Sequence, residues 1–173
     1  MAGGDLELVP DDPRIDPPPS APEKEMLAAW LDYHRDTALM KCEGLSDEEL
    51  RHPMVVSGTN MLGIIKHMAY VERWWFQGVF AAQDPEFPWS DEDPDAEFRI
   101  ADGETASSVF DFYRSECSKS RAIAAEADSD DIARHSKSER SLRWIFMHMI
   151  EETARHNGHL DILREMIDGT TGE

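Results

Sequence analysis

Three side chains with metal-binding chemistry lie close together near the C-terminal end of the sequence. His156 follows Glu152 by four positions, and His159 comes three positions later. Side chains four residues apart project from the same face of an α-helix, so Glu152 and His156 can offer two ligands to one metal ion. A third ligand has to come from another element. His67 is the candidate, because it lies on the inward stripe of an earlier predicted helix, where an imidazole is poorly accommodated.

Two histidines and one carboxylate are typical of a catalytic metal site, because such a set leaves coordination positions open to water or substrate. We expect one divalent ion, zinc first, with nickel or iron as alternatives, since these ligand types alone do not select the metal. The same residues also fit a metal-free Glu–His–His hydrogen-bond network in a polar core. Both interpretations place His67, Glu152 and His156 inside the fold. His159 is a candidate for orienting a ligand or moving a proton, or else an ordinary histidine at the end of the core.

The predicted helix that carries Glu152 and His156 has the clearest periodicity in the sequence. Its inward residues follow one another at alternating steps of three and four: Leu142, Ile145, Met149, Glu152, His156, His159, Leu163 and Met166. This heptad pattern is typical of a helix in a bundle, and Gly169 is expected to end it. An isolated carboxylate is costly to bury, so Glu152 must be protonated, paired with a base or bound to a cation.

Three more long helices are predicted upstream, and they complete the set that would position these ligands. They span residues 23 to 44, residues 61 to 82, and a segment from Asp102 or Thr105 to the polar stretch that begins at Asp128. Ser46 and Glu49 fit a capping box for a short helical turn between the first two. The aromatic residues of the second and last helices are read as ordinary core rather than as pocket walls: Trp74, Trp75, Phe76 and Trp144.

The pattern predicts an all-α protein, a four-helix bundle over residues 22–170. Residues 1–21 are rich in proline and aspartate, and we expect a disordered tail there. Residues 83–103 carry three prolines and eight acidic residues around Phe87, Trp89 and Phe98, which favours a solvated loop with aromatic anchors. A connection of this length also permits a bundle in which neighbouring helices are not simple hairpins.

Charge and composition exclude several classes of partner. The 173 residues hold 17 Lys and Arg against 36 Asp and Glu, a net charge of −19 that repels nucleic-acid phosphates. No apolar run approaches the roughly 18 residues that a membrane span needs. The N-terminal sequence lacks the pattern of a secretory signal, and the 2 cysteines do not form a disulfide framework, so a cytoplasmic protein is expected.

Two segments resemble the DinB-like superfamily over about residues 25–168 of the chain: residues 63–75, which contain His67, and residues 151–161. The Glu-x-x-x-His spacing of Glu152 and His156 is similar to that of the branch with the mycothiol-dependent maleylpyruvate isomerases and mycothiol transferases. The resemblance implies a four-helix bundle, often a homodimer, with a divalent metal on His67, Glu152 and His156. It also implies mycothiol, or a similar thiol, as cosubstrate.

The resemblance further implies how such an enzyme works. The metal, as a Lewis acid, lowers the thiol pKa and holds a thiolate beside an electrophilic small molecule, in a transferase or isomerase reaction. Because the sequence ends just after the predicted bundle, we favour transfer to another electrophile over maleylpyruvate isomerisation. Two other functions stay open: a non-catalytic, stress-related bundle that binds a metal or a small molecule, and a metal-free structural dimer.

Overall fold

The computed structural model describes residue 12 and residues 14–172 of the chain. Most of the predicted tail, residues 1–11 and residue 13, therefore lies outside the described residues. The remainder of that segment has no helix before Glu23. The guanidinium of Arg14 lies 4.7 Å from the ring centroid of Tyr33 and donates a hydrogen bond to the Thr37 hydroxyl at 3.2 Å. This end of the segment therefore contacts the first helix.

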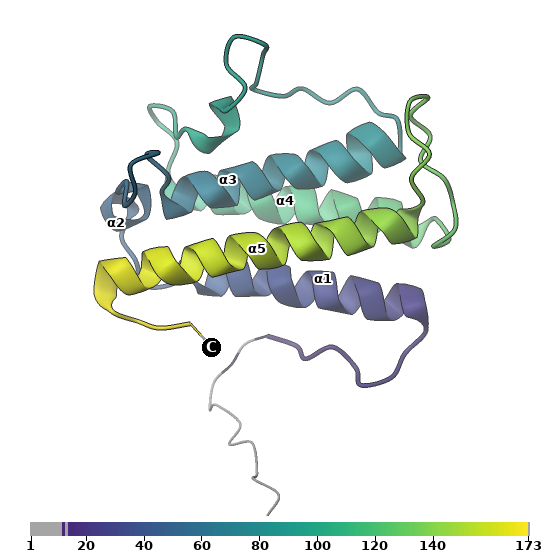
Figure 1. Ribbon diagram of the computed structural model, residues 1–173, viewed down its shortest axis with the longest axis horizontal. Helices are drawn as coiled ribbons and strands as arrows, with labels where there is room; N and C mark the ends of the chain where they lie inside the picture. Colours follow the sequence, from purple (N-terminus) through teal and green to yellow (C-terminus); the bar gives the residue numbers. More distant parts are fainter. Residues whose placement is uncertain (1–11, 13, 173) are drawn as a thin grey trace, which may run out of the picture.

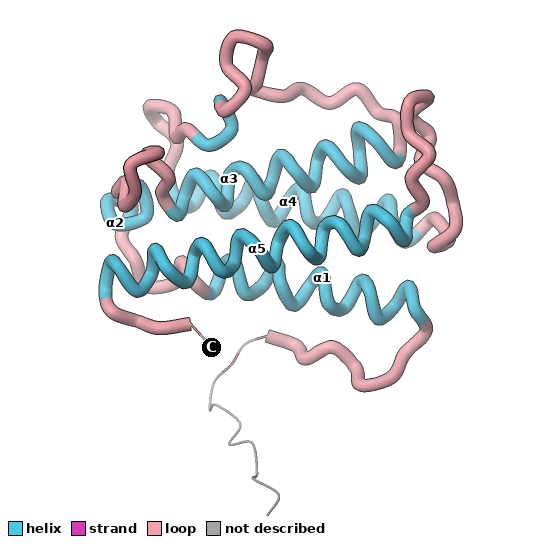
Figure 2. The backbone as a smooth tube through the Cα atoms, viewed as in Figure 1, coloured by secondary structure: helices cyan, strands magenta, loops and turns pink. Residues whose placement is uncertain are grey.

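The described residues fold into helices joined by loops, which confirms the predicted all-α class (Figure 2). In chain order the elements are α1 (Glu23–Met40), α2 (Asp47–Arg51), α3 (Met61–Glu72), a π-helix (Arg73–Phe80), a 3-10 turn (Ala96–Phe98), α4 (Ala106–Ala125) and α5 (Leu142–Asp168). Ile132 and Ser141 form an isolated β-bridge in the connection before α5. No described helix is both long enough and apolar enough to span a membrane.

The four long helices pack as two parallel pairs, α1 with α5 and α3 with α4 (Figure 1). The chain runs along α3 in one direction, returns over the outer side of α3 through residues 81–105, and then enters α4. This connection lets α3 and α4 run in the same direction, as its length permits. It also lays the acidic loop, residues 83–103, along α3.

Local sequence signals account for the helix ends. Ser46 and Glu49 form the predicted capping box of α2, with the Ser46 amide donating to Glu49 Oε2 at 2.7 Å. Thr105, rather than Asp102, caps α4. Gly169 ends α5 at φ 79°, a left-handed conformation that glycine adopts without a steric penalty.

The second long helix differs from the uninterrupted helix predicted over residues 61–82. From Arg73 to Phe80 its hydrogen bonds follow the wider π pattern, which changes the direction of the side chains relative to an α-helix. Phe76 and Phe80 consequently point into the core, whereas Trp74 is 43% exposed. Trp144 of α5 is also exposed, so the core interpretation holds for Phe76 and was wrong for Trp74 and Trp144.

Two apolar clusters form the core, one at each end of the bundle. One contains Met61, Ile65, Tyr113 and Leu160, and the other contains Leu31, Phe76 and Ile145. Between them, each long helix contributes polar residues to the interior: Arg35 from α1, Glu72 from α3, Ser120 from α4, and Thr153, His156 and Asn157 from α5. The candidate ligands belong to this polar layer.

The inward stripe of α5 drifts along the helix. Leu142, Met149 and Leu163 are buried as predicted. The alternate members of the predicted stripe turn progressively toward solvent: Ile145 is buried, Glu152 is half-buried, and His159 and Met166 are exposed. Thr153 and Leu160, each one position further along the chain than Glu152 and His159, are buried in their place. A heptad repeat drifts by about 20° per seven residues on a straight helix, which explains the difference. The prediction that His159 occupies a core position was therefore wrong.

Candidate metal centre

The structure brings His67, Glu152 and His156 together, although His67 lies 85 positions before Glu152 in the chain. Each of the three offers a ligand atom, and these atoms all lie within 4.8 Å of one another. Glu152 Oε1 is 3.2 Å from His156 Nε2 and 3.5 Å from His67 Nε2. We call these residues the triad. Its position between α3 and α5 is the one that the spacing predicts.

Hydrogen bonds from two imidazoles favour an ionised Glu152, against the effect of burial. Its pKa lies well below the ordinary value, because the imidazole of His156 and then that of His67 hydrogen-bond the carboxylate, which outweighs desolvation. The guanidinium of Arg155 is 3.6 Å from Glu152 Oε2, too far for a hydrogen bond, and its partner is Glu151. The carboxylate is therefore held mainly by two imidazoles, a type of group that also binds metal ions.

His159 contacts the triad from outside the core. Its Nδ1 lies 3.4 Å from Nδ1 of His156, the ring nitrogen that faces away from Glu152. Desolvation lowers the His159 pKa, and the charges of His156 and Arg155 add to this effect. An imidazole in this place can set the tautomer of His156 while it stays in contact with solvent.

Glu97, which the sequence did not single out, contacts the triad from the acidic loop. Its Oε1 is 3.4 Å from Nδ1 of His67, and the residue is 8% exposed. The ring of the next residue, Phe98, stacks on the His67 imidazole with 4.1 Å between centroids. The loop thus fixes the ring plane of His67 and places a carboxylate behind it, as is common for metal-binding histidines.

A glycine in α3, Gly63, allows the acidic loop to approach the helix closely. A Cβ on Gly63 would lie 2.3 Å from the carbonyl oxygen of Phe98, so only glycine fits here without a shift. Gly63 is one helical turn before His67 on α3, and its amide donates to Asn60 Oδ1, the cap of the helix. A glycine inside a predicted helix is a sequence signal for such a contact, although the signal does not name the partner.

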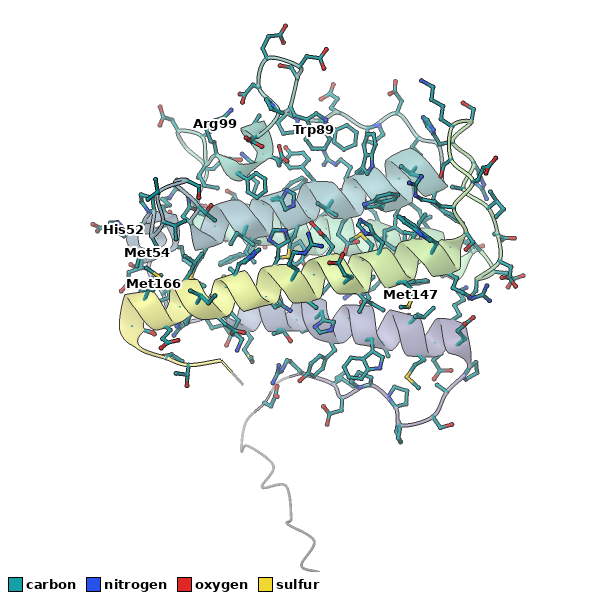
Figure 3. All side chains as sticks on the ribbon, in the orientation of Figure 1. His52, Met54, Trp89, Arg99, Met147 and Met166 are labelled. Atoms are coloured by element: carbon teal, nitrogen blue, oxygen red, sulfur yellow. The ribbon has the colours of Figure 1, made fainter. Side chains whose placement is uncertain are left out.

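A cavity of about 230 Å³ opens beside the triad, and we call it the aromatic pocket. Its lining residues are His67, Tyr70, Val71, Trp74, Trp75, Trp89 and Glu97. Trp89, a residue of the acidic loop, lies on the outer side of α3 (Figure 3). A larger cavity, of about 700 Å³, lies at the N-terminal end of α3 and is lined by Phe98, which separates it from His67.

Several other histidine, arginine and cysteine side chains lie outside the triad. His148 packs between Trp75 and Trp144, in keeping with a helix-boundary position. Arg73, the first residue of the π-helix, pairs with Glu116 of α4 at 3.0 Å. Cys42 and Cys117 are buried free cysteines, and burial raises the pKa of each thiol, that of Cys42 to about 12. Neither thiol is therefore poised for thiolate chemistry.

The donor set fits a divalent metal. Two imidazole nitrogens and one carboxylate oxygen converge from two helices, and the outer nitrogens of both imidazoles face Glu97 and His159. Such a site can hold an ion while coordination positions stay open. The aromatic pocket supplies a place for a small molecule next to His67.

Comparison with known proteins identifies the family of the chain. The family model of the mycothiol S-transferases matches residues 26–169, which include the triad and all of the bundle except the first turn of α1. A search of curated proteins found no match to this chain. The match confirms the predicted relationship to the mycothiol transferase branch. The chain belongs to the mycothiol S-transferase family.

Proposed function

We propose that this protein is a metal-dependent mycothiol S-transferase that acts on an electrophilic small molecule. The observation that carries the proposal is the convergence of ligand atoms of His67, Glu152 and His156 within 4.8 Å, with His67 also in the wall of the aromatic pocket. The family match supports mycothiol as the thiol. We take zinc as the first candidate for the metal, with nickel and iron as alternatives.

The chain's own residues have defined tasks in this proposal. His67, Glu152 and His156 would hold the ion, which when bound supplies a Lewis acid that favours the thiolate. Glu97 and Phe98 fix the His67 ring, and His159 orients His156. No cysteine of this protein is needed, which agrees with the raised thiol pKa of both buried cysteines.

The reaction is a nucleophilic substitution. The thiolate sulfur forms a bond to the electrophilic carbon, and the leaving group departs with the electron pair of the bond that breaks. The thiol proton passes to solvent, and exposed His159, which contacts His156, would carry it there. The product is a thioether of mycothiol.

The test is turnover by the zinc-loaded protein with mycothiol and a benzylic halide, followed by formation of the thioether. We expect activity in the native sequence and a loss of at least about 100-fold in His156→Ala. His34→Ala is the matched control, because it removes another half-buried imidazole, which contacts Trp30 and Tyr33. Equal rates in native protein and His156→Ala would contradict the proposal and favour a non-catalytic binding bundle.

A further inference from the structure

The aromatic pocket combines two features that rarely occur together. Its walls present the rings of Tyr70, Trp74, Trp75 and Trp89. Among them lies Glu97, whose Oε2 is buried and has no hydrogen-bond partner. A buried carboxylate oxygen without a partner carries a large desolvation cost, so its position in a pocket points to a ligand that donates a hydrogen bond.

The rings themselves favour a positive charge. Trp89 meets Tyr70 edge-on at 5.9 Å and Trp74 at 6.2 Å, so these rings stand at steep angles to one another around the pocket. Aromatic faces attract cations, and several faces together recognise ammonium groups. The protein's own cations already use two of these rings: Arg73 lies 5.2 Å from the Tyr70 centroid and Arg140 lies 5.5 Å from that of Trp75.

The surrounding charge acts in the same direction. The acidic loop contributes eight acidic residues and one basic residue, Arg99, which is paired with Asp93. Of the two guanidinium groups over the pocket's rings, Arg73 is neutralised by Glu116, and Arg140 lies over Trp75. The chain as a whole carries a charge of −19. Such a field concentrates cations at the pocket and repels anions.

We propose that the aromatic pocket binds the electrophilic acceptor and selects an organic cation, an ammonium with at least one N–H and an apolar body. The ammonium donates to Glu97 Oε2, and its charge lies against the faces of the tryptophans. The identification of this ligand as the acceptor rests on the proposed transferase function. Because His67 belongs to both the triad and the pocket wall, an acceptor in the pocket lies beside the site where the thiolate would be held.

Calorimetric titration of the zinc-loaded protein without mycothiol tests the selection directly. The probes are benzylammonium, benzyl alcohol and benzoate, which share one ring and differ in charge. We expect benzylammonium to bind at least tenfold more tightly than the other two. Glu97→Gln should abolish this preference, and Glu92→Gln, an exposed acid of the same loop, should change it less than twofold.

A second variant protects the test against misfolding of the loop. Trp74→Leu removes a ring that is already 43% exposed, so the fold should tolerate it, and it should reduce the preference for benzylammonium at least threefold. Equal binding of the three probes, no binding of any, or a preference that survives both Glu97→Gln and Trp74→Leu would overturn the inference.

A kinetic comparison separates this inference from the proposed function. Two benzylic halides are used, one bearing an aminomethyl group and one bearing a carboxylate. Faster transfer to the cationic halide supports both proposals. Turnover with no preference for the cation overturns the inference alone. Cation selection in the titration without turnover of either halide overturns the transferase proposal and leaves the pocket a cation-binding site.

Discussion

Two carboxylates in the polar layer of the bundle have very different surroundings. Glu72 is 1% exposed, and both its oxygens accept hydrogen bonds from Arg35, at 2.8 and 2.6 Å. Glu152 is half-buried, and its closest partners are imidazole nitrogens at 3.2 and 3.5 Å. A bidentate guanidinium satisfies Glu72 permanently. The longer contacts of Glu152 leave it available to a cation, as the proposed metal site requires.

The largest expected effect comes from breaking the Glu72 pair. Arg35→Met should lower the free energy of unfolding by about 3–5 kcal/mol, because it leaves a buried carboxylate without a partner. Urea denaturation at neutral pH measures the change. The double variant Arg35→Met, Glu72→Met should recover most of the loss. A single variant as stable as the native protein would show that Glu72 does not depend on Arg35.

Removing the charge of Glu152 should lower the affinity of the protein for metal. Glu152→Gln keeps the shape of the side chain but removes the charged ligand, so we expect zinc affinity to fall at least about 100-fold. Competition with a chromophoric chelator measures the affinity. His34→Ala should leave the affinity unchanged. An unaltered zinc affinity in Glu152→Gln would show that Glu152 is not a ligand. The contrast drawn between Glu152 and Glu72 would then fail.

The surroundings of His67 provide a third test. Gly63→Ala places a methyl group against the Phe98 carbonyl, and overpacking of this kind typically costs about 1–3 kcal/mol. The 3-10 turn should move away from α3 and weaken the contact between Glu97 and His67. Ring-nitrogen shifts of His67 in NMR spectra report that contact. Gly158→Ala is the control, because a Cβ there meets no atom within 4 Å. An unchanged His67 signal in Gly63→Ala would argue against positioning by the loop.

The smallest effect is the pH dependence of stability in the metal-free protein. The pKa of Glu152 is lower in the folded state than its ordinary 4.5, because His156 and His67 hydrogen-bond the carboxylate. The stabilisation is therefore complete above pH 4.5 and is lost as the pH falls through the depressed pKa. The difference in urea midpoint between the native protein and Glu152→Gln should shrink below pH 4.5. A difference that grows toward low pH would contradict the assigned hydrogen bonds.

Local signals predicted the elements well. The capping box at Ser46, the glycine end of α5 at Gly169 and the spacing of Glu152 and His156 each depend on residues within one or two turns. His67 was singled out because an imidazole is poorly accommodated on the apolar stripe of a helix unless it has a polar partner. In each case either both interacting residues lie close together in the sequence, or one residue of an unusual type marks the position.

Features that depend on the course of the chain were missed. Glu97 reaches His67, and Trp89 reaches the aromatic pocket, only because the acidic loop returns along α3, which no local pattern encodes. The π-helix after Glu72 redirects Arg73 to Glu116, and hydrophobic periodicity assumes a regular α-helix. His159 was placed in the core because a strict heptad does not follow the drift of a straight helix.

The most direct test of the triad is metal analysis of protein purified without a chelator and without a nickel affinity tag. The native sequence is compared with His67→Ala, Glu152→Ala and His156→Ala, with His34→Ala as control and circular dichroism to verify folding. The account predicts about one divalent metal per chain in the native protein and in His34→Ala, and its loss in each folded triad variant. A native protein that is metal-free and cannot be loaded with zinc, iron or nickel would contradict it.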